Sequence, residues 1–254
     1  MKSSRIMKVF ESYVKKYNMN NINIKTRYFH SLKVMELCRD IATSLEVFTE
    51  EEIVLCELIG LFHEIGGFNS TPNFHISESE GENIYNKTIE ILFDKGLIRE
   101  ITKDTKYDKI IKFAIYAYDK EGLPENIGQK VKYICGVIRD AHNLDTFRMA
   151  INYNYIDLRI DSYPNQMVYD NFKSFKKIHT KVSDNTADDV LAILSNVFII
   201  NFKYSYYLLK NNMYINKMIE ALSIKDENIL LFFKQLGGVL NNYVDRKIGV
   251  YNAI

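Results

Sequence analysis

His63 and Glu64 are two adjacent side chains that could bind a metal ion, and they lie near the end of a strongly apolar segment at residues 57–68. Cys56, Ile59 and His63 are spaced as one face of a helix, so the imidazole is predicted to point into the core. A histidine on such a face is more often a core residue with one hydrogen bond than a metal ligand. The pair therefore indicates a metal site only if further ligands join it.

Two other segments also place polar side chains at predicted core positions. His30 and Asp140 each share one face of a predicted helix with apolar residues at three- and four-residue intervals. Burying an unpaired carboxylate costs several kcal/mol, so Asp140 is predicted to have a partner. With His63 and Glu64, these residues make a set of two imidazoles and two carboxylates, which suits one divalent ion of Mn, Fe, Ni, Zn or Mg. Such an ion activates a bound water and polarises a phosphoryl oxygen, which favours hydrolysis of a phosphate ester.

The segments that position these residues are predicted to be helices. Thr49 and Glu52 form the pattern of a capping box, and Gly66 and Gly67 end the same helix. Apolar periodicity predicts helices at 1–22, 25–45, 49–64, 78–95, 105–120, 128–150, 188–210, 214–222 and 226–247, with a short helix after Pro164. The fold class is therefore expected to be all-α.

The domain organisation is predicted as a helical core at residues 1–152 and a C-terminal helical extension at 153–254 that packs on the core. We expect the two parts to form one continuous domain, and a boundary near 152–186 is the alternative. An irregular segment at 65–77 could form the rim of a cleft.

Net charge, cysteine usage and the length of the apolar segments limit the binding partners and the cellular compartment that we expect. The formal net charge is +1, so no nucleic-acid or membrane partner is expected. Three cysteines without Cys-x-x-Cys spacing indicate a reducing compartment. The longest apolar segment, 190–202, is shorter than the roughly 20 residues that span a bilayer, and no signal peptide is apparent. We expect a cytoplasmic protein whose oligomeric state the sequence leaves open.

Three segments carry a resemblance to a known family. They are Arg-Tyr-Phe-His-Ser-Leu-Lys-Val at 27–34, Leu-Phe-His-Glu-Ile-Gly-Gly-Phe at 61–68 and Ile-Arg-Asp-Ala-His-Asn-Leu-Asp-Thr-Phe-Arg at 138–148. Together they resemble the HD superfamily of metal-dependent phosphohydrolases, and the resemblance extends through 201–205, as in a bacterial subgroup of similar length. It implies an HD-like helical bundle with additional C-terminal helices. It also implies His30, His63, Glu64 and Asp140 as metal ligands, and a nucleotide or other small phosphorylated metabolite as substrate.

The chain departs from the family pattern at three places. Glu64 replaces the signature aspartate, Tyr118 stands where the subgroup usually has a histidine, and Gly67 replaces a basic residue. These departures favour at most one metal ion. They also support an alternative function, in which a catalytically impaired HD-like protein binds a metal or a nucleotide in a regulatory role.

Four residues near the predicted ligands are candidates for catalysis or substrate binding, and three of them also have a structural interpretation. Lys33, one turn after His30, is a candidate catalytic and substrate-binding residue, because its charge would neutralise a phosphate; a solvated lysine on the helix flank is an equal alternative. Asp145 is a second catalytic candidate, and Arg148 and Tyr118 are substrate-binding candidates, although Asp145 and Arg148 could simply form an i, i+3 pair. The remaining histidines are expected outside the site, with His75 and His142 at the surface and His179 in no motif.

Overall fold

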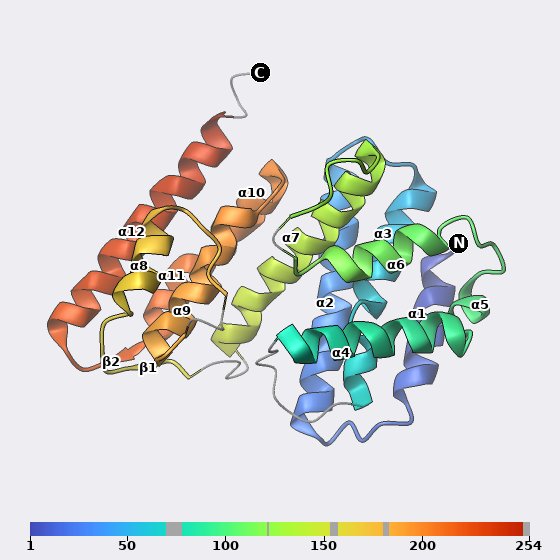
Figure 1. Ribbon diagram of the computed structural model, residues 1–254, viewed down its shortest axis with the longest axis horizontal. Coiled ribbons are helices and arrows are strands. Elements are labelled where there is room, and N and C mark those ends of the chain that lie inside the picture. The colour runs from blue at the N-terminus through green and yellow to red at the C-terminus, as the bar shows by residue number, and fades with distance from the viewer. Residues whose placement is uncertain (70–77, 121, 153–156, 180–182, 251–254) are drawn as a thin grey trace. The chain divides into compact units, whose positions relative to one another are not determined.

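The computed structural model describes residues 1–69, 78–120, 122–152, 157–179 and 183–250, and these residues are mostly helical (Figure 1). They belong to two compact units, Met1–His142 and Asn143–Ile254. The described residues contain one pair of strands, in which β1 (Arg159–Ile160) and β2 (Ser223–Ile224) are parallel and only two residues long. The all-α prediction is confirmed, whereas the division after residue 152 stays a prediction.

Among its described residues the first unit contains seven α-helices, and the last of these, α7, continues into the second unit. They are α1 (Ser3–Val14), α2 (Ile22–Ser44), α3 (Glu50–Phe62), α4 (Glu78–Ile89), α5 (Leu97–Ile101), α6 (Asp108–Ala117) and α7 (Gln129–Asn152), with a 3₁₀ helix η1 (Ile65–Asn69) and a π-helical turn η2 (Glu90–Asp94).

The described part of the second unit adds five further α-helices. They are α8 (Gln166–Lys173), α9 (Thr186–Leu194), α10 (Lys203–Asn211), α11 (Tyr214–Ala221) and α12 (Glu227–Val250), with a 3₁₀ helix η4 (Ser195–Ile199). In the part of the chain that the structure describes, no helix has both the length and the apolar character to cross a membrane.

Helix α3 lies at the centre of the first unit and begins where the sequence predicts. The Thr49 side chain accepts a hydrogen bond from the Glu52 N–H at 3.3 Å, and the Glu52 carboxylate accepts one from the Thr49 N–H at 2.8 Å. This reciprocal pair is a capping box. The helix ends at Phe62, so His63 and Glu64 come directly after its last turn.

Helices α1 and α4 hold the segment that follows Glu64. The Gly66 N–H donates to the Thr88 hydroxyl of α4 at 3.0 Å, and a Cβ on Gly66 would lie 2.6 Å from the α4 backbone. On α1, the ring of Phe10 packs against Phe62 and Phe68 with centroids 5.5 and 6.1 Å apart. The segment after the His-Glu pair is therefore fixed by neighbours on both α1 and α4.

The predicted helix at 188–210 is wrong, because the structure divides it into α9, η4 and α10. The Ser195 hydroxyl donates to the Ala192 carbonyl at 2.7 Å, and the Lys177 ammonium donates to the same carbonyl at 3.2 Å. These bonds compete with the backbone N–H that would continue the α-helix. The five-residue helix α5 is absent from the prediction because it is too short to show periodicity.

Candidate metal centre

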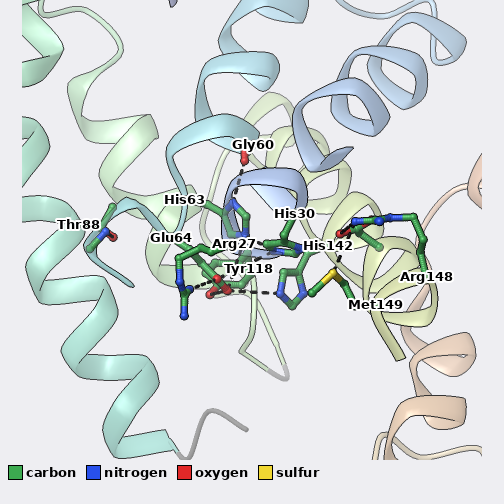
Figure 2. Close-up of polar contacts among 12 residues, drawn as sticks. Arg27, His30, Gly60, His63, Glu64, Thr88, Tyr118, His142, Arg148 and Met149 are labelled. Atoms are coloured by element: carbon green, nitrogen blue, oxygen red, sulfur yellow. Dashed lines mark hydrogen bonds and ion pairs between the residues drawn. The ribbon is translucent and has the colours of Figure 1, made fainter. Parts of the chain in front are cut away.

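Four side chains of the first unit form a cluster that could hold a metal ion: His30, His63, Glu64 and His142. Each offers one ligand atom, and these atoms all lie within 4.8 Å of one another. Figure 2 shows the three imidazoles gathered around the Glu64 carboxylate. His30 comes from α2, His63 and Glu64 follow α3, and His142 comes from α7, so the packing of three helices creates the cluster.

His63 is held with one ring nitrogen directed into the cluster. Its side chain is fully buried, and its Nδ1 lies 2.7 Å from the Gly60 carbonyl oxygen. Burial lowers the pKa of His63 to about 3, so the ring is neutral near pH 7. A neutral ring that donates from Nδ1 to Gly60 keeps the lone pair on Nε2, which is the form that binds metals.

The spacing of the imidazole donors fits a single ion. The Nε2 atoms of His30 and His63 are 3.3 Å apart. Metal–nitrogen bonds of about 2.0–2.1 Å place two neighbouring ligands roughly 2.8–3.0 Å apart in octahedral coordination and roughly 3.3–3.4 Å apart in tetrahedral coordination. The two imidazoles therefore already have the separation that a shared ion requires.

The Glu64 carboxylate is fixed by partners on both oxygens. Arg27 Nη1 donates to Oε2 at 2.6 Å, and the Tyr118 hydroxyl donates to Oε1 at 3.1 Å. The imidazoles lie farther away, with Nε2 of His142, His63 and His30 at 3.6, 3.8 and 4.0 Å from the nearer oxygen. Burial alone would raise the pKa of Glu64, but the surrounding imidazoles and the Arg27 guanidinium hold that pKa well below its usual value. Glu64 is therefore an anion.

Arg27 reaches Glu64 because residue 67 has no side chain. A Cβ on Gly67 would lie 2.4 Å from Arg27 Nη1 and 2.5 Å from Cζ, so the guanidinium lies directly against the glycine. Arg27 is 4% exposed and Glu64 is 2% exposed, which makes this a buried ion pair. A basic residue is thus present beside the carboxylate, although it comes from α2 and not from position 67.

Tyr118 is positioned by a contact at the end of α6. Arg139 of α7 donates from Nη2 to the carbonyls of Ala117 and Lys120, at 3.1 and 2.7 Å, and so caps this helix end. Burial and the neighbouring Glu64 charge raise the pKa of Tyr118 well above its usual value. Its hydroxyl therefore keeps its proton and acts as a donor to Glu64.

The structure brings together three of the four predicted ligands and adds a fourth that was not predicted. His30, His63 and Glu64 belong to the cluster, but Asp140 is not in the set of four, although it is fully buried. The prediction that His142 lies at the surface is wrong, because it joins the cluster with its side chain 21% exposed. Side chains two residues apart on a helix point about 160° away from each other, so the face occupied by His142 is not the face of Asp140.

The remaining candidate residues take the following places. Lys33 forms an i, i+3 ion pair with Glu36 at 2.9 Å. In the second unit, both Asp145 oxygens accept hydrogen bonds from Arg148, one of them at 3.0 Å. His75 lies outside the described residues, and His179 belongs to the second unit. Substrate or catalytic roles for Lys33, Asp145, Arg148 and Tyr118, and metal ligation by Asp140, stay predictions.

Comparisons with known proteins give one match. A family model described as the HD domain matches residues 27–128. This range includes His30, His63, Glu64 and Tyr118, and it ends before His142. No curated protein and no solved structure matches the chain.

Proposed function

We propose, from the match of residues 27–128 to the HD domain of metal-dependent phosphohydrolases, that this chain binds one divalent ion and hydrolyses a small phosphorylated metabolite. The ligands in this proposal are His30, His63, Glu64 and His142. The observation that carries it is the convergence of three imidazoles on one ionised, buried carboxylate. Nucleotides are the first substrates to test.

The donor set narrows the choice of ion. Three imidazole nitrogens and one carboxylate oxygen suit Zn, Fe, Ni and Co, whereas Mg prefers oxygen ligands and retained waters. A first-row transition ion therefore fits these residues better than Mg. When bound, such an ion lowers the pKa of a coordinated water and polarises a phosphoryl oxygen.

The protein's own residues prepare the centre in three ways. Gly60 fixes the tautomer of His63 through the 2.7 Å contact with Nδ1. Arg27 and Tyr118 hold the two oxygens of Glu64, so the carboxylate cannot rotate freely. Burial of His30, His63 and Glu64 keeps bulk water from these donors and strengthens each electrostatic interaction.

Substrate contacts are part of the same proposal. His142 is the most exposed of the four donors, so a phosphate ester is expected to enter beside it. Lys33 lies one turn beyond His30 on α2, where its ammonium would exchange Glu36 for a phosphate oxygen. A lysine binds phosphate as a point charge and needs no fixed geometry, which makes this exchange feasible.

The test combines metal analysis with turnover. The full chain is purified without chelator, its transition metals are quantified, and phosphate release is measured over a panel of nucleotides and sugar phosphates. His63→Ala is expected to lose the metal and at least about 100-fold of the activity, because it removes a ligand. The matched control is His179→Ala, which removes a histidine of the second unit and should retain both.

One observation favours the alternative of a regulatory protein without turnover. The ion pair between Arg27 and Glu64 occupies part of the carboxylate that a metal needs. Stoichiometric metal without phosphate release from any substrate would support this alternative. Absence of metal after supplementation with Mn, Fe, Co, Ni and Zn would refute the hydrolase and the metal-binding form of the regulatory protein.

A further inference from the structure

Beyond the proposed function, and resting on it, we infer that the metal ion and a phosphate group bind this centre cooperatively, each strengthening the binding of the other. The inference comes from the ion pair between Arg27 and Glu64. This pair cancels the single negative charge of the four-residue cluster before any metal arrives.

The balance of charge is the first step. Among the four donors, only Glu64 is a carboxylate, and imidazoles bind metals as neutral ligands. The Arg27 guanidinium is a cation. The Arg27 Nη1 atom lies 2.6 Å from Glu64 Oε2, so this pair carries no net charge. A divalent ion would therefore bring two positive charges that these protein groups do not neutralise.

Burial makes this excess charge costly. His30 is 5% exposed, His63 is 0% exposed and Glu64 is 2% exposed, so the ion would enter an environment with little water. Unpaired charge in such an environment is strongly unfavourable. A phosphate dianion bound beside the ion would neutralise its two positive charges. It could also accept a hydrogen bond from a cationic side chain such as Lys33.

Arg27 is buried where it contacts the carboxylate. Its guanidinium lies against Gly67, where a Cβ would come within 2.4–2.9 Å of three guanidinium atoms. The side chain is 4% exposed and is packed in this position. The positive charge therefore stays at the site and opposes a second cation until an anion compensates it.

The experiment measures metal affinity with and without phosphate. Binding of Co²⁺ to the full chain is followed by titration calorimetry and by the visible absorption of the bound ion. Inorganic phosphate is kept below the concentration at which it binds free Co²⁺, and the reference buffer contains chloride at equal ionic strength. Phosphate is expected to tighten Co²⁺ binding about 10-fold or more, within the 5–150-fold range usual for coupled sites. Co²⁺ must then tighten phosphate binding by the same factor.

Variants of Arg27 identify the origin of the coupling. Arg27→Met is expected to raise Co²⁺ affinity without phosphate and to reduce the coupling to less than about threefold, whereas Arg27→Lys keeps the charge and most of the coupling. Arg39→Met is the matched control. Arg39 also lies on α2 and pairs with Glu57 and Glu50 at 2.5 and 3.2 Å, so this variant removes a more exposed arginine–glutamate pair of the same helix, away from the cluster.

The possible outcomes separate this inference from the proposed function. Equal Co²⁺ affinity with and without phosphate in the parent protein would overturn the inference, even if the enzyme hydrolyses phosphate esters. Equal coupling in Arg27→Met and the parent would also overturn it. Conversely, coupling that depends on Arg27, without any turnover, would support the inference and refute the proposed hydrolysis. The parent measurement stands by itself if Arg27→Met does not fold.

Discussion

Replacing Gly67 with alanine is expected to destabilise the protein, although the backbone at this residue accepts alanine. Among the described glycines only Gly96 has a positive φ, so backbone strain does not arise at residue 67. The new Cβ would lie 2.4 Å from Nη1, 2.5 Å from Cζ and 2.9 Å from Nε of Arg27. The guanidinium must therefore move, and the 2.6 Å contact with Glu64 must lengthen.

The magnitude follows from three contributions. Overpacking at a tight site costs about 1–3 kcal/mol. Complete loss of a partner from a buried ion pair costs about 3–5 kcal/mol, which sets the upper limit for a displaced Arg27. Replacement of glycine by alanine also restricts the unfolded chain, which stabilises the fold by about 0.4–1 kcal/mol. We expect Gly67→Ala to lower the free energy of unfolding by about 2 kcal/mol.

A double-mutant cycle with Arg27→Ala tests this reasoning through urea unfolding curves. Without the guanidinium, Gly67→Ala has no clash and is expected to be neutral or to stabilise by up to about 1 kcal/mol. Gly238→Ala is the control, because this exposed glycine of α12 has no atom within 4 Å of an added Cβ. An equal cost of Gly67→Ala in the parent and in Arg27→Ala would refute the reasoning.

Two further predictions concern other buried polar groups. Tyr118→Phe removes the donor 3.1 Å from Glu64 and is expected to lower the free energy of unfolding by about 1–2 kcal/mol, so unchanged urea curves would contradict it. Lys177 donates to Ala192 and Asn196, and burial lowers the pKa of its ammonium from 10.5 to about 8. Below pH 8 the folded protein must hold this partly buried charge, so the free energy of unfolding should rise by up to about 3 kcal/mol as the pH increases from about 8 to 10.5. In Lys177→Met this rise should be absent, and parallel pH profiles for the parent and the variant would show that the lysine is not the cause.

Features encoded by neighbouring residues were predictable from the sequence. The capping box of Thr49 and Glu52 depends on residues three apart, and helix α3 begins where it places the start. His30 and His63 follow the apolar periodicity of their helices, which correctly turns them into the core. Two of the four cluster residues therefore follow from local patterns, and Glu64 follows as the neighbour of His63.

The fourth residue and its surroundings depend on contacts that local patterns do not contain. Helix α7 is buried on all sides from Ile134 to Ala141, so an apolar stripe cannot distinguish the face of Asp140 from that of His142. Arg27 approaches Glu64 only because Gly67 leaves space for it, and this requires knowledge of how two segments pack. The sequence did contain one indication. Arg27 lies three residues before His30, and Gly67 stands where the family pattern has a basic residue.

The family match begins at residue 27 and ends at residue 128, and these bounds matter for the design of shorter fragments of this chain. A recombinant piece cut at residues 27 and 128 would lack His142, and its cluster would keep three donors in place of four. It would also lack Phe10, which packs on Phe62 and Phe68 on either side of the His-Glu pair. A negative assay on such a truncated domain would say nothing about the intact chain.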